Sequence, residues 1–118
     1  MRMMLSILIL LASTAIASAQ SVPVEIWSYV TTTIVVTDNG VEVCRTAPDK
    51  ACRFSLVVGA HHIEIAGPGG ARLVGDVSVD GSVPLVDQLS DCDFTASGCP
   101  NFPGPKRVFG IGSWMLVP

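Results

Sequence analysis

Short runs of β-branched and aromatic residues, separated by turn residues, make up most of the chain after residue 19. The run from Val22 to Thr37 alternates apolar with polar side chains and is long enough for two strands. Segments such as DNG at 38–40 and GPGG at 67–70 supply turns, and a last apolar strand is expected over 107–117. About seven short strands with almost no helical periodicity predict an all-β fold, either a small antiparallel β-sandwich or an open barrel.

The first 19 residues have a different character. Arg2 precedes an apolar run that ends in Ala-Ser-Ala before Gln20. A basic start, a short apolar run and small residues at the cleavage point are typical of a secretory signal peptide. The run is too short to cross a membrane, which takes about 20 apolar residues. We therefore expect a cleaved signal peptide at 1–19 and a single exported domain at 20–118, periplasmic or secreted, with no transmembrane anchor.

The four cysteines all lie in the predicted exported portion, where thiols are normally oxidised. They form two close pairs, Cys44 with Cys52 and Cys92 with Cys99, and each pair brackets a turn-rich loop. Four cysteines allow three pairings, of which nearest-neighbour pairing is the simplest hypothesis. Neither spacing fits a structural zinc site or a redox-active C-x-x-C motif, so we predict two disulfides.

Charge argues against a nucleic-acid partner. Seven Lys and Arg residues stand against ten Asp and Glu residues, which gives a formal net charge of −3. Binding to phosphate backbones needs clustered positive charge, and the only adjacent basic pair is Lys106-Arg107. We predict that the protein does not bind DNA or RNA.

Residues 34–66 follow a recurring order of strand, glycine turn, short strand, second turn, apolar strand, glycine, histidine and strand. In this order the segment resembles the PEGA-type surface domain. The matching residues are Thr46 and Pro48 in the second turn, Gly59, and His61 or His62. The resemblance implies a small β-sandwich of exported or surface proteins that acts as an interaction or scaffolding module.

The adjacent histidines His61 and His62 are the first candidates for chemistry. Successive side chains on a strand point to opposite faces, so Ile63 should face the core with His61, while His62 and Glu64 face solvent. Two histidines that diverge in this way do not readily bind one metal ion. The interpretation that we favour is a partly buried His61 and an outward polar pair, with His62 and Glu64 as weak metal or acid-base candidates.

The remaining polar candidates are Asp87, Asp91 and Asp93, which cluster around Cys92. Carboxylates near a rigid loop are typical Ca²⁺ ligands, but the spacing is not that of an EF-hand, so a solvated acidic loop is the favoured interpretation. No triad of Ser, His and Asp has a supporting spacing. We predict no bound cofactor or metal and no catalytic residues.

Large aromatic residues occur in the first and last predicted strands. They either fill the core or form a partner-binding patch at the strand edges. The four residues are Trp27, Tyr29, Phe109 and Trp114.

Two functions from different classes follow. The first is an exported, non-catalytic binding or scaffolding module that contacts another protein or an envelope component. The alternative is a small metal-dependent or hydrolytic enzyme that uses His61, His62 and Glu64 or the acidic loop at 87–93.

Overall fold

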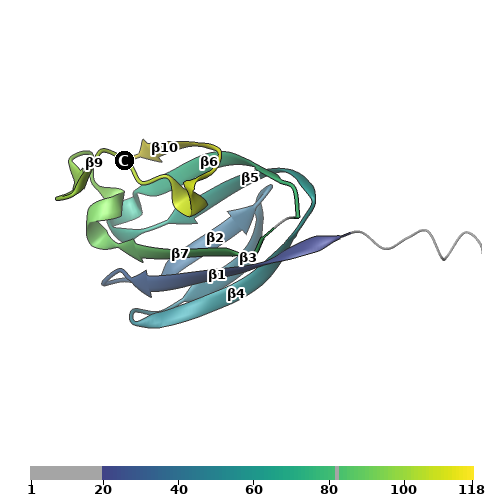
Figure 1. Ribbon diagram of the computed structural model, residues 1–118. Helices are drawn as coiled ribbons and strands as arrows, with labels where there is room; N and C mark the ends of the chain where they lie inside the picture. Colours follow the sequence, from purple (N-terminus) through teal and green to yellow (C-terminus); the bar gives the residue numbers. More distant parts are fainter. Residues whose placement is uncertain (1–19, 82) are drawn as a thin grey trace, which may run out of the picture.

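The computed structural model describes residues 20–81 and 83–118 and shows a β-sandwich of two sheets, with a small hairpin at one end (Figure 1). This confirms the predicted all-β class. The predicted signal peptide falls on residues 1–19, outside the described residues. The strands are β1 (Ser21–Tyr29), β2 (Ile34–Asp38), β3 (Val41–Thr46), β4 (Lys50–Val57), β5 (Gly59–Ala66), β6 (Arg72–Val79), β7 (Leu85–Ser90), β8 (Gly98–Cys99), β9 (Phe102–Pro103) and β10 (Ser113–Val117).

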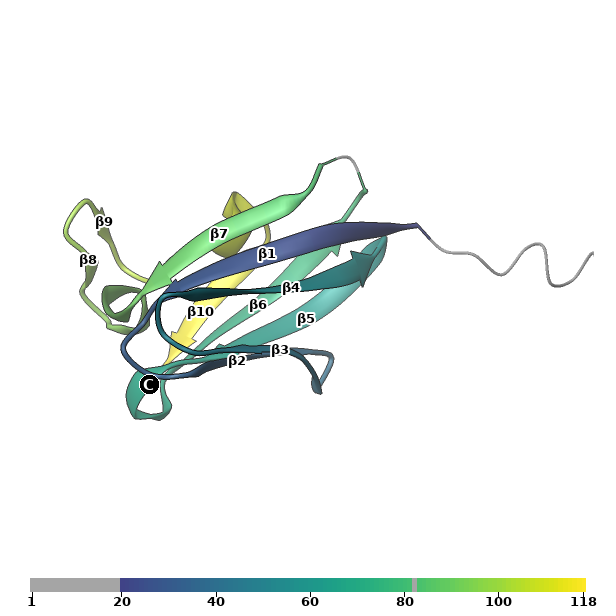
Figure 2. The same cartoon turned by 90° about the horizontal axis from the view of Figure 1, so that it is seen from below.

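One layer is a three-stranded sheet with the order β4-β1-β7, and the other is a five-stranded sheet with the order β10-β6-β5-β2-β3 (Figure 2). All neighbouring strands run antiparallel except β1 and β7, which pair in parallel with Val24 opposite Leu85. Strand β7 therefore departs from the predicted antiparallel arrangement. The chain crosses from β6 in the other sheet to β7, so no tight hairpin sets the direction of this pairing.

The core lies between the sheets and follows the period-two alternation of the strands. In β1, Val22, Val24 and Ile26 are buried, and in β5 Ile63 and Ile65 are buried. Leu73 on β6 and Leu89 on β7 are fully buried in the same core. Burial of each such side chain stabilises the fold by roughly 1.5–3 kcal/mol before entropy is counted, so the alternation fixes which face of each strand points inward.

Turn residues end the strands where the sequence predicts. The β2–β3 turn places Asn39 and Gly40 at φ values of 49° and 86°, the left-handed conformation that an Asn-Gly hairpin favours. The GPGG segment forms the short 3₁₀ helix η1 (Pro68–Gly70) between β5 and β6.

The last strand is shorter than predicted. Strand β10 begins at Ser113, and residues before it form the 3₁₀ helix η3 (Val108–Gly110). Phe109 adopts φ 60° and Gly110 φ 66°, conformations that no strand accommodates. The predicted strand over 107–117 is therefore wrong in its first half.

The disulfides pair nearest neighbours, as predicted. Cys44 lies on β3 in the five-stranded sheet and Cys52 on β4 in the three-stranded sheet, so their disulfide joins the two layers at one side of the sandwich. The second disulfide links Cys92 to Cys99 and closes the loop that follows β7, across the 3₁₀ helix η2 (Asp91–Phe94) and β8.

Among the residues that the structure describes, no helix has both the length and the apolar character needed to cross a membrane.

Replacing both Cys44 and Cys52 with alanine should lower the free energy of unfolding by about 2–3 kcal/mol, because the denatured chain regains loop entropy. The loss of the covalent link between the two sheets should add to this effect. The measurement is urea unfolding followed by fluorescence. The matched control replaces Cys92 and Cys99, which close a loop of similar length, seven residues apart rather than eight, outside the two main sheets. A control variant that is destabilised as much as, or more than, the Cys44 and Cys52 variant would contradict this role.

Candidate functional site

The side of the three-stranded sheet that faces away from the core keeps several apolar side chains in solvent. Because β1 buries Val24 and Ile26, its alternate residues Pro23, Trp27 and Tyr29 point outward. Tyr29 is 48% exposed, and from the flanking strands Val57 is 49% and Val86 58% exposed. We call this surface the outer face and define it as Pro23, Glu25, Trp27, Tyr29, Arg53, Ser55, Val57 and Val86.

A charged pair crosses the middle of the outer face. Arg53 Nε lies 2.9 Å from Glu25 Oε2, and Trp27 Nε1 donates to Glu25 Oε1 at 2.5 Å. These two hydrogen bonds, first that of Trp27 and then that of Arg53, lower the pKa of Glu25. The Arg53 guanidinium also lies 6.0 Å from the Trp27 ring centroid, within cation-π range. The cation and the anion at the centre of the face therefore compensate one another.

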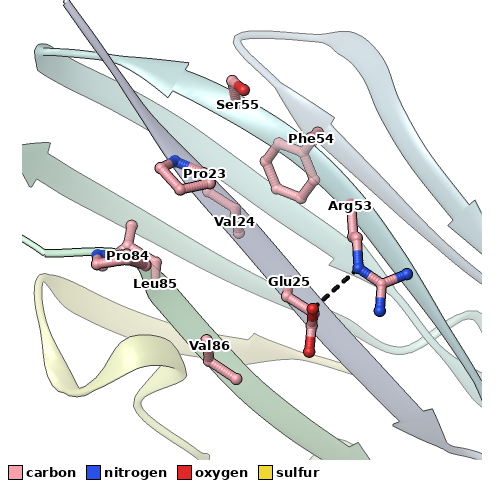
Figure 3. Close-up of a pocket in the computed structure, with 9 residues that line it drawn as sticks. All are labelled: Pro23, Val24, Glu25, Arg53, Phe54, Ser55, Pro84, Leu85 and Val86. Atoms are coloured by element: carbon pink, nitrogen blue, oxygen red, sulfur yellow. Dashed lines mark hydrogen bonds and ion pairs between the residues drawn. The ribbon is translucent and has the colours of Figure 1, made fainter.

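A shallow groove of about 370 Å³ lies beside this pair. Its lining is mostly apolar, with Val86 and Pro84 on one side of β1 and Phe54 on the other, while Glu25 and Arg53 stand at its end (Figure 3). Large flat apolar surfaces on soluble proteins commonly mark contact sites for other molecules. The outer face combines exposed apolar side chains and this groove with a compensated charge.

The four aromatic residues singled out by the sequence do not form one surface. Trp27 and Tyr29 lie on the outer face, whereas Phe109 and Trp114 pack against the core. Trp114 lies against Gly75 of β6 and donates its indole N–H to the Ile111 carbonyl at 2.6 Å. The structure thus brings one pair to a surface and uses the other pair for packing.

His61 is buried and faces the core, as the alternation predicts. Its Nδ1 lies 2.9 Å from both carboxylate oxygens of Asp38 on β2, and its Nε2 lies 2.6 Å from the Val57 carbonyl oxygen on β4. Burial disfavours the charged ring, but the Val57 carbonyl and the Asp38 carboxylate outweigh burial and raise the pKa of His61. With two acceptors around it, the imidazolium can donate from both nitrogens, which links the two sheets at this end.

His62 and Glu64 point to solvent, also as predicted. His62 Nδ1 lies 2.9 Å from Asp76 Oδ1 on β6, and its Nε2 lies 3.8 Å from Glu64 Oε2. Glu64 also pairs with Arg72. The two carboxylates approach different nitrogens of one ring, so these side chains form a row of polar contacts across the sheet rather than a convergent set of ligands.

The three aspartates around Cys92 each bind protein donors. Asp91 accepts hydrogen bonds from the Thr31 backbone N–H and hydroxyl, both at 2.9 Å. Asp93 caps η2 by accepting from the Ser90 N–H at 2.8 Å. Asp87 accepts from the Phe109 N–H at 2.5 Å and pairs with Lys106 Nζ at 2.8 Å. The acidic cluster therefore anchors three loops.

One close group of potential metal ligands occurs among the described residues, namely Cys92, Asp93 and Cys99. Both sulfurs of this group belong to a disulfide, so neither is available as the thiolate that binds a metal.

The sequence did not reveal a second concave surface, which lies beyond the end of β7. It is a pocket of about 640 Å³ bounded by Gln88 and Ser90 on β7 and by residues 101–107, including the 78% exposed Phe102. The signal in the sequence that could have indicated this pocket is the long connection between β7 and β10, which contains only short helices and strands. Long connections are commonly functional.

Comparison with protein-family models, with curated proteins and with solved structures found no match. The resemblance of residues 34–66 to the PEGA-type domain therefore stays a prediction.

The His61 cluster predicts a pH-dependent stability. Because the pKa of His61 is raised above its ordinary value of 6.5, its contribution to the free energy of unfolding is complete below that pH and is lost as the pH rises through the raised pKa. In urea unfolding from about pH 6 to about pH 9, His61→Gln should therefore cost most at the acidic end and progressively less above neutrality.

The matched control for this measurement is His62→Gln, which leaves His61, Asp38 and Val57 in place and should therefore keep the loss of stability above neutrality that His61 contributes. A His61→Gln variant whose destabilisation is constant over the same range would show that the ring is not charged in the folded protein.

Proposed function

We propose that the protein is an exported, non-catalytic binding or scaffolding module of the periplasm or cell envelope, and that the outer face contacts another protein or an envelope component. The observation that carries this proposal is the exposure of Tyr29, Val57 and Val86 on one face of the three-stranded sheet, which also carries the compensated Glu25 and Arg53 pair. A surface of this kind gains free energy when a partner covers it, since roughly 25 cal/mol is gained for each Å² of apolar area removed from water.

The other polar clusters support a binding role rather than chemistry. His61, Asp87, Asp91 and Asp93 each bind groups of the protein itself, so their hydrogen-bonding capacity stabilises loops and sheets. Catalytic groups in contrast need a free atom directed at a substrate.

The compartment proposal rests on two kinds of support. Two disulfides suit an oxidising environment, and the N-terminal sequence is typical of a secretory signal. The resemblance of residues 34–66 to a surface domain fits the same proposal. Periplasmic and secreted residence are equally compatible with this support.

The test is to crosslink the tagged protein in its native host and to compare what copurifies with the wild type and with the double variant Tyr29→Ala, Val86→Ser. Both positions are solvent-exposed, so the fold should be retained, while capture of a specific partner should fall at least tenfold. Trp27→Ala, in the centre of the face, should have the same effect.

The control variant is Val41→Ser, a 66% exposed residue at the start of β3 on the other sheet. It should capture the same partner as the wild type. If the Tyr29→Ala, Val86→Ser variant captures the partner as well as the wild type does, the partner does not bind the outer face.

A further inference from the structure

The chain around the pocket beyond β7 is fixed by a disulfide and by three carboxylate contacts. The Cys92–Cys99 disulfide closes the loop on one side, and Asp93 fixes η2 through the Ser90 N–H. On the other side Asp87 holds both Lys106 and the Phe109 N–H. In Figures 1 and 2 the β8–β9 hairpin projects past the end of β7. Such preorganisation lowers the entropy cost of binding a ligand.

The same part of the chain carries an aromatic ring that is exposed to solvent. Phe102 at the start of β9 is 78% exposed and lines the pocket. An exposed phenyl ring of this kind offers an apolar plane that gains free energy when a ligand covers it. Pro103 and Pro105 flank it and add further apolar surface.

The polar lining of the pocket includes two uncharged side-chain amides. The amides of Gln88 and Asn101 form no hydrogen bond to other described residues, so each keeps a free donor and a free acceptor. Lys106 pairs with Asp87, and Asp93 accepts from the Ser90 N–H. Arg107 is exposed and donates to the Gly112 carbonyl at 3.3 Å, so most of its N–H groups can also donate to a ligand hydroxyl.

From these features we infer that the pocket is a binding site for a neutral saccharide. A pyranose ring has a flat face of C–H groups that can pack on Phe102, and hydroxyl groups at its rim that both donate and accept hydrogen bonds. Carboxamides such as those of Gln88 and Asn101 match hydroxyls in both directions. The volume of about 640 Å³ lies within the range of roughly 300–1,000 Å³ typical of small-molecule sites.

A proline-rich peptide is the competing ligand, since aromatic and proline-lined grooves bind such peptides. Its backbone, however, lacks N–H groups at proline and offers mainly carbonyl acceptors. The acceptor oxygens of Gln88 and Asn101 would then remain unmatched. The hydroxyl groups of a saccharide can pair with both the N–H donor and the oxygen acceptor of each amide, which favours a saccharide over a proline-rich peptide.

The site goes beyond the proposed function, because Asn101 and Phe102 lie on the chain that follows β7, while Gln88 and Ser90 border the outer face as ladder neighbours of Trp27 and Tyr29. The test titrates the folded protein with three neutral oligosaccharides, chitohexaose, cellohexaose and mannohexaose, and with a decaproline peptide, using NMR chemical shifts and calorimetry. We expect saturable binding of at least one oligosaccharide, with shift changes centred on residues 88–90 and 101–107. Phe102→Ala, and separately the double variant Gln88→Ala, Asn101→Ala, should each weaken binding at least tenfold.

The control variant Met115→Ala changes a 60% exposed residue on β10 and should bind as the wild type does. The Val57→Ser variant changes a 49% exposed residue of the outer face on β4, which β1 separates from β7, and it should also retain saccharide binding. A failure of the outer-face proposal and a failure of this one are therefore distinguishable. Binding of decaproline alone, no binding of any oligosaccharide, or binding that survives Phe102→Ala would each overturn the inference.

Discussion

Packing of the two sheets through alternating aliphatic side chains is the interaction on which the rest of this structure depends. Ile26, Ile34 and Ile65 are fully buried between the layers, and each fixes the inward face of its own strand. Once the inward face is set, the outward residues follow by alternation. The outer face exists because β1 must bury Val24 and Ile26, which directs Trp27 and Tyr29 into solvent.

Two further constraints close the ends of the sandwich. The Cys44–Cys52 disulfide joins β3 to β4 across the layers, and His61 reaches from β5 to the Val57 carbonyl on β4. Both act where the chain passes from one sheet to the other, so both hold together strands that share no backbone ladder. The acidic residues have a comparable role along β7, at the other edge of the three-stranded sheet from β4, where Asp87 and Asp91 bind residues of two loops.

Local patterns predicted much of this fold. Alternation placed His61 inside and His62 outside, turn residues located the hairpin at Asn39, and close spacing gave the disulfide pairs. Local patterns do not predict which distant parts of the chain pair or pack with one another. The parallel pairing of β7 with β1 depends on a crossover between sheets, and the split of the aromatics depends on Gly75 leaving room for the Trp114 ring. The partners of the aspartates lie as far as 60 positions away, as with Thr31 and Asp91, and no spacing rule reaches that distance.

Site-specific photocrosslinking in the native host tests the binding role of the outer face, with a photoreactive residue at position 29 in one strain and at position 41 in another. Positions 29 and 41 are both exposed but lie on different sheets, so the two strains differ in which surface reports contact. A partner on the outer face predicts a discrete crosslinked product from position 29 and none from position 41. Equal products from both positions, or a product from position 41 alone, would contradict a binding role for the outer face.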